Sequence, residues 1–101
     1  MTSIRKGAKK MTEKALTKLE DKMELALTKI KLRINSFHVT RYYCIWHCGK
    51  LQVSYLLKEQ KFELLDIIND FGNYKVLYYG NDFDDLIEEI KIYVNRKENL
   101  K

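Results

Sequence analysis

The chain has 101 residues, of which 46% are hydrophobic and 33% charged, with four glycines and no proline. This length suits one compact domain, and no proline-rich or glycine-rich linker interrupts it. No stretch approaches the roughly 18 apolar residues that a membrane span needs. The first ten residues lack the apolar core of a signal peptide, so we expect a soluble protein of the cytoplasm, with no membrane partner.

The net charge of +5 is unevenly distributed along the chain. Residues 1–35 hold ten Lys or Arg against four Asp or Glu, a net of +6, whereas residues 36–101 hold nine against ten, a net of −1. Such asymmetry indicates a basic segment that meets an anionic partner, although lysine also serves simply as a soluble helix former. The candidate basic binding surface consists of Arg5, Lys6, Lys9, Lys10, Lys14, Lys18 and Lys22.

Residues 1–11 carry four of these cations, a glycine and no acidic residue, which predicts a flexible basic arm. The remaining residues, 12–101, are expected to form a single compact domain. Thr12 can cap a helix that runs to about Arg33 and whose apolar positions step by three and four: Leu16, Leu19, Met23, Ala26 and Ile30. This stripe predicts a helix packed on the core; homodimerisation through the same stripe is the alternative.

The stretch Ser36–Leu57 concentrates aromatic and β-branched residues, which predicts a β-hairpin that serves as the platform of the fold. Gly49 is the only turn signal within it. A two-residue loop would put Trp46 and Leu51 on one face, whereas a three-residue loop would pair Ile45 with Leu51. We prefer the three-residue loop because it gathers more aliphatic residues on a single face.

Three further elements follow the hairpin. Phe62, Leu65 and Ile68 have helical spacing and predict a helix over Lys58–Asp70. Gly72 lies just beyond its expected end. Tyr74–Tyr79 is predicted to form a strand. Because a helix would join it to the second hairpin strand, the two strands are expected to run parallel. Asp82 then caps a last helix. The predicted fold is therefore α+β in the order αββαβα, with a three-stranded sheet, a long N-terminal helix on one face and two further helices on the other.

The residues best suited to metal or nucleophilic chemistry do not have a functional spacing. Cys44, His47 and Cys48, with His38 upstream, lack the two close pairs of a structural zinc site. Along a strand the two cysteines would lie about 13 Å apart, too far for a disulfide. We therefore expect free thiols, no metal and no cofactor.

The acidic run that begins at Asp82 could hold Mg²⁺, but capping of a helix start explains it without a metal. The phosphate-binding, dinucleotide-binding and zinc-protease motifs are all lacking. We predict a protein without enzymatic activity.

A cluster of aromatic and basic residues in the hairpin is the candidate for secondary contacts. Tyr42 and Trp46, with Arg41 nearby, could stack unpaired bases on a sheet face. The alternative, which we prefer, is that these aromatic residues lie under the first helix as a second small core.

The Lys-, Ile-, Asn- and Tyr-rich composition and the basic leader MTSIRKGAKK resemble small accessory proteins of phages that infect low-GC bacteria. The chain is similar in this respect to some type II anti-CRISPR proteins. The resemblance implies a phage-encoded inhibitor that binds a nucleic-acid-processing enzyme of the bacterial host, such as an RNA-guided nuclease. The alternative is a regulatory protein that binds DNA or RNA directly through the basic arm and first helix. The expected partner is thus a protein or nucleoprotein complex, or a nucleic acid.

Overall fold

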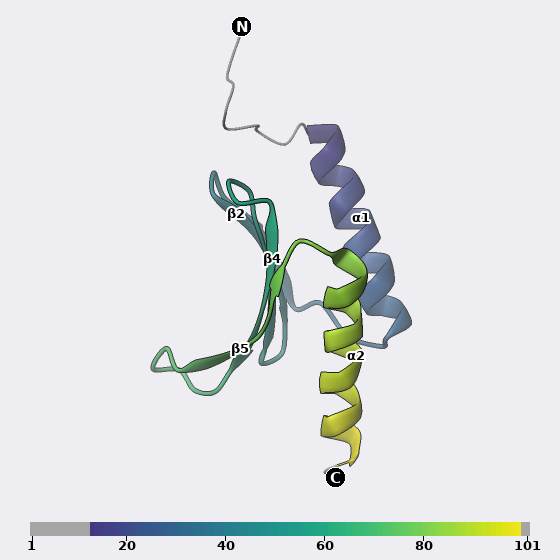
Figure 1. The fold of residues 1–101 in the computed structure, drawn as a ribbon, viewed down its shortest axis with the longest axis vertical. Helices are drawn as coiled ribbons and strands as arrows, with labels where there is room; N and C mark the ends of the chain where they lie inside the picture. The colour runs from purple at the N-terminus through teal and green to yellow at the C-terminus, as the bar shows by residue number, and fades with distance from the viewer. Residues whose placement is uncertain (1–12, 100–101) are drawn as a thin grey trace, which may run out of the picture.

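The computed structural model describes residues 13–99, which form a helix, then a five-stranded antiparallel sheet, then a second helix in chain order. The elements in chain order are α1 (Glu13–Lys29), β1 (Ser36–Val39), β2 (Tyr43–Cys48), β3 (Leu51–Leu56), β4 (Lys61–Ile67), β5 (Tyr74–Gly80) and α2 (Phe83–Asn99). Neighbouring strands in the chain are also neighbours in the sheet. Figure 1 shows that both helices lie on the same side of the sheet, so the protein has two layers.

The α+β class is correct, but the predicted order αββαβα, the three-stranded sheet and the helices on both faces are wrong. Residues 58–70, predicted as a helix, form a turn and strand β4. Tyr74–Tyr79 is a strand as predicted, yet β5 runs antiparallel to β4 because a hairpin rather than a crossover helix joins them.

One face of the sheet, which we call the covered face, packs against both helices. It is lined by alternate residues of the central strands: Cys44, Trp46, Cys48, Leu51, Val53, Phe62 and Leu64. From α1, Met23 and Leu27 are buried against it, and from α2, Leu86 and Ile90. The stripe of α1 therefore packs on the protein's own core, as predicted.

The predicted hairpin has neither of the two registers considered, although its faces are those of a two-residue loop. Cys48 pairs with Leu51 around a two-residue turn, Gly49–Lys50, so Trp46 shares the covered face with Leu51 and the preferred three-residue loop is wrong. Gly49 has φ +64°, and a left-handed glycine at the first turn position is the arrangement of a type II′ hairpin. Its twist matches that of the flanking strands, whereas the rejected register would have turned Trp46 to the opposite face.

Two of the other turns between strands contain no glycine. Between β1 and β2, the Thr40 hydroxyl accepts hydrogen bonds from the backbone N–H groups of Tyr42 and Tyr43, each 3.1 Å long. Between β3 and β4, the Gln60 N–H donates to the Leu56 carbonyl at 2.8 Å, and Gln60 adopts the left-handed φ of +55°. Side-chain bonding and a strained residue thus do what glycine does elsewhere.

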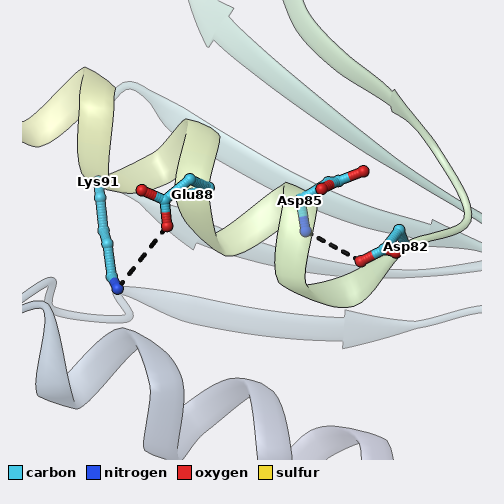
Figure 2. A network of polar contacts seen from close by, with 4 residues as sticks. All are labelled: Asp82, Asp85, Glu88 and Lys91. Carbon is cyan, nitrogen blue, oxygen red and sulfur yellow. Dashed lines mark hydrogen bonds and ion pairs between the residues drawn. The ribbon is translucent and has the colours of Figure 1, made fainter.

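The last strand joins α2 through a cap that the sequence predicts. The Asp82 side chain accepts a hydrogen bond of 3.0 Å from the backbone N–H of Asp85, as Figure 2 shows. Asp84 and Asp85 lie in the first turn of α2 and Arg96 and Lys97 in its last, an order that complements the helix dipole. The acidic run therefore starts the helix.

The C-terminal end of α1 is closed by a Schellman motif. The Leu32 N–H donates to the Leu27 carbonyl and the Lys31 N–H to the Thr28 carbonyl, both at 2.9 Å. This motif requires a left-handed residue, usually glycine, and Lys31 occupies that position with φ +68°. The Cβ atom of a lysine makes this conformation costly.

Lys31→Gly is therefore expected to raise the free energy of unfolding by about 1 kcal/mol, because glycine adopts the left-handed conformation without strain. The matched control is Lys29→Gly, which places glycine inside the last helical turn and should lower stability by about 1 kcal/mol. Urea denaturation monitored by circular dichroism measures both. A Lys31→Gly variant no more stable than the wild type would contradict the strain at this position.

Candidate functional site

The outer surface of α1 carries the described part of the predicted basic surface. At 100° per residue, its four lysines fall within an arc of roughly 80° on the side away from the core: Lys14, Lys18, Lys22 and Lys29. All four are exposed. Three glutamates gather on a separate flank of the helix: Glu13, Glu20 and Glu24. The remaining predicted cations, Arg5, Lys6, Lys9 and Lys10, lie outside the described residues, as does the predicted arm.

Counting charges by element changes the meaning of the asymmetry. Residues 13–29 hold four lysines and four acidic residues, so α1 has no net charge. The excess of +6 in residues 1–35 comes from four cations before α1 and from Lys31 and Arg33 after it. The helix is therefore a mixed-charge surface with a basic flank and an acidic flank, and it does not present a uniformly cationic face.

Leu25 lies inside the lysine arc and is 58% exposed. Its helical neighbours at i−3 and i+4 are Lys22 and Lys29, and Asp21 lies at i−4. An exposed apolar side chain surrounded by charged groups has the composition of a small protein interface, with a hydrophobic centre and a polar rim. We call Leu25 and these lysines, with Lys18, the outer face of α1.

A cation–π contact orders one part of this face. The Lys22 ammonium lies 4.3 Å from the centroid of the Phe83 ring at the start of α2. Phe83 in turn contacts Phe62 of the sheet, with ring centroids 5.8 Å apart. Lys22 is thus held against the protein surface by a chain of aromatic contacts, whereas Lys14 and Lys18 have no such contact within residues 13–99.

A shallow groove continues the basic flank between the end of α1 and the middle of α2. Its volume is about 360 Å³, and it is lined by Lys29, Ile30, Lys31, Lys91, Val94 and Asn95. Lys91 also lies 3.9 Å from Glu88, an exposed i,i+3 pair drawn in Figure 2. None of its three lysines, Lys29, Lys31 and Lys91, is among the seven residues of the predicted basic surface.

The three candidate secondary contacts are separated by the fold. Trp46 is 1% exposed and packs on Phe37 on the covered face, with ring centroids 4.9 Å apart. It is therefore a residue of the main core and not available to a partner. The interpretation of these aromatic residues as a second small core is right about the burial of Trp46 and wrong for Tyr42. Arg41 and Tyr42 lie in the β1–β2 turn, where both are exposed.

The two thiols are buried beneath the helices. Cys44 and Cys48 are unpaired cysteines on the covered face. Burial raises the pKa of Cys48 to about 11 and, with a smaller contribution from the Glu20 charge, raises the pKa of Cys44. Both thiols are therefore protonated at neutral pH, the opposite of what a nucleophile or a metal ligand requires.

His38 and His47 meet on the other face of the sheet, with ring centroids 5.6 Å apart and the rings nearly perpendicular. Neighbouring strand residues point to opposite faces, so these imidazoles and the thiols are on different sides of the sheet. Within residues 13–99, no cluster of three or more His, Cys, Asp or Glu side chains has a geometry that could hold a metal ion. No helix in the same range is long and apolar enough to cross a membrane.

The structure also contains a surface that the sequence analysis missed. The β4–β5 hairpin exposes Phe71 at its turn, and β5 exposes Tyr74, Val76 and Tyr79. The sequence Asn69-Asp70-Phe71-Gly72 is typical of a turn, and Gly72 adopts a positive φ of +88°. Because Gly72 was interpreted as the end of a helix, the hairpin was not predicted.

Comparisons of the chain with protein-family models, with curated proteins and with solved structures find no significant match. We therefore argue function from the arrangement of the described residues and from the resemblance noted above.

The buried thiols predict how stability depends on pH. The folded-state pKa of Cys48 lies above its ordinary value of 9.0, at about 11, so the unfolded chain loses this proton first as pH rises. The free energy of unfolding is then insensitive to this group below about pH 9 and falls towards pH 11, by at most about 1.4 kcal/mol per pH unit.

Cys48→Ala should flatten this decline relative to the wild type. Tyr55 and Tyr93 also have pKa values raised by burial, so the difference between the two proteins, and not the wild-type curve alone, isolates the thiol. Urea denaturation between pH 7 and pH 11 measures it. Parallel curves for the two proteins would contradict the assignment.

Proposed function

We propose that this protein is a non-catalytic binding protein that inhibits a nucleic-acid-processing enzyme by occupying part of its surface, with the outer face of α1 as the contact. The observation that carries the proposal is Leu25, an apolar side chain left 58% exposed among the lysines of that face. Leaving a leucine in water on an otherwise polar helix surface gains nothing for folding, whereas burying it against a partner is favourable.

The charges of α1 favour a protein partner over a nucleic acid. A phosphate backbone attracts the lysine arc but repels the glutamate flank and Asp21, which lies beside Leu25. A protein surface can place an acidic group against each lysine and a basic group against each glutamate. The mixed charges of the helix thus fit a partner that also carries both signs.

The class of partner follows from the resemblance and from the cations on either side of α1. Enzymes that act on nucleic acid carry basic surface where they bind phosphate, so the lysines of this protein would contact acidic surface elsewhere on such an enzyme. The resemblance to anti-CRISPR proteins makes an RNA-guided nuclease the first candidate target. On this proposal the remaining fold holds α1 in place.

Leu25→Asp is expected to weaken target binding by at least about tenfold, because a buried carboxylate replaces an apolar contact. The measurement is affinity capture from nuclease-treated host lysate with tagged wild-type and variant protein. The matched control is Ile92→Ser, which removes an apolar side chain of α2 that is also exposed. Wild type and control should capture the same nucleic-acid-processing enzyme, and Leu25→Asp should not. Equal capture by all three, or capture of no such enzyme, rejects the proposal.

Direct binding of DNA or RNA is the second candidate function, and the lysine arc of α1 with the groove lysines favours it. Such binding should weaken steeply with salt, and replacing Arg5, Lys6, Lys9 and Lys10 by Ala should reduce the slope by up to ~0.9 per lost phosphate contact. Fluorescence anisotropy with labelled duplex and single strands measures this. Negligible affinity for both at about 50–150 mM salt excludes direct binding.

A further inference from the structure

The exposed apolar side chains of the protein are concentrated in one place. Nine large hydrophobic residues in the described part of the chain are substantially exposed, and five of these nine lie between positions 68 and 79: Ile68, Phe71, Tyr74, Val76 and Tyr79. The hairpin from β4 to β5 and the edge strand β5 carry all five. Such a concentration of exposed apolar side chains is typical of an interaction site.

Four of the five residues form a protruding part and a flat part, and Ile68 belongs to neither because it follows Ile67 of the open face. Phe71, 91% exposed, stands at the tip of the hairpin. Its position is fixed because its backbone N–H donates to the Asn69 side chain at 2.9 Å and the Ile68 N–H donates to the Asn73 carbonyl at 2.8 Å. Phe71 is therefore held out from the body by an ordered turn.

The flat part is the side of the sheet away from the helices, which we call the open face. Tyr74, Val76 and Tyr79 lie on it, as their pairing with Ile67, Leu65 and Glu63 of β4 shows. In Figure 1, the β4–β5 hairpin, where β5 begins, extends away from both helices. A register shift at Leu64 and Leu65 interrupts the pairing of its strands, as a β-bulge does.

We propose that this surface binds a second copy of the same chain across a two-fold axis, with Phe71 of each copy packing on Tyr74, Val76 and Tyr79 of the other. A protruding anchor and a flat apolar platform on the same molecule are what an isologous interface needs, because each patch must contact its own equivalent. The open face supplies the platform and the hairpin tip supplies the anchor.

The charges of β5 do not oppose such an interface. Lys75 is the cross-strand partner of Asp66 and lies with it on the covered face. The side chains that β5 places on the open face, Tyr74, Val76 and Tyr79, are therefore uncharged. Two equivalent patches can meet across a two-fold axis without bringing like charges of β5 together.

The exposed area fits a weak dimer. Phe71, Tyr74 and Tyr79, which are 91%, 55% and 51% exposed, leave on the order of 400 Å² uncovered at about 200 Å² for each complete side chain. With Val76, which is 49% exposed, the patch is roughly 475 Å², so two copies would bury at most about 950 Å². This is the size of a weak or transient interface, and we expect a Kd on the order of 1–100 µM.

Sedimentation equilibrium between about 1 and 500 µM tests the proposal. The average mass should rise from the 12.1 kDa of the monomer towards twice that value. Phe71→Ser should raise the dimer Kd by at least about tenfold, because the anchor is lost. The matched control is Tyr42→Ser, which removes an aromatic residue that is 67% exposed in the β1–β2 turn, outside the patch, and should leave the Kd unchanged.

A second variant tests the platform. Val76→Asp places a carboxylate on the open face and should also raise the dimer Kd by at least about tenfold. Circular dichroism confirms that every variant is folded. A wild-type chain that stays monomeric to the highest concentration overturns the proposal and leaves the patch to a different protein. Equal weakening by Phe71→Ser and Tyr42→Ser, or an unchanged Kd for Val76→Asp, overturns it as well.

Discussion

The packing of two helices on one face of the sheet determines every other surface of this protein. Trp46 is the largest fully buried side chain, and Met23 and Leu27 of α1 and Leu86 of α2 are buried in the same cluster. The hydrophobic effect favours covering apolar area, but two helices suffice for only one face of five strands. The other face, and the outer sides of the helices, must therefore meet water or a partner.

The two proposed contacts occupy what this packing leaves exposed. The apolar stripe of α1 packs on the core. The opposite side of the helix, with Leu25 among its lysines, is left exposed. On the open face, the polar residues of the first three strands, such as His47 and Gln52, give way to apolar residues on β5. Antiparallel sheets with one solvated face usually alternate between apolar and polar residues, and β5 departs from that pattern.

Strong local signals allowed the sequence to predict some elements and not others. The stripe of α1, the Asp82 cap and the aromatic run of β5 each depend on neighbouring residues only, and all three predictions are confirmed. Two glycine turns were located but their geometry was mispredicted, at Gly49 and Gly72, and two further turns without glycine or proline were missed. Thr40 makes a turn through its hydroxyl and Gln60 through a left-handed conformation, neither of which composition signals. Without these turns, the apolar spacing of residues 62–68 suits a helix as well as a strand.

The same limits explain how much of the candidate surfaces could be predicted. The lysines of α1 were identified by counting, but a count by segment does not separate the basic and acidic flanks of a helix or reveal Leu25 between them. Trp46 was placed among the contacts because either hairpin face was plausible until the register of β2 and β3 was known. The apolar hairpin was hidden by the single error that made residues 58–70 a helix.

The two contacts lie on opposite sides of the sheet, so a dimer formed through Phe71 keeps both α1 outer faces accessible. Two weak contacts on one assembly bind a target with two sites more tightly than either contact alone, provided that the geometry allows both to engage. Linkage then works in both directions: dimerisation increases affinity for such a target, and the target increases dimerisation by the same factor. A dimer with a Kd in the micromolar range is suited to this coupling, because at low concentration the chain is monomeric until a target brings two copies together.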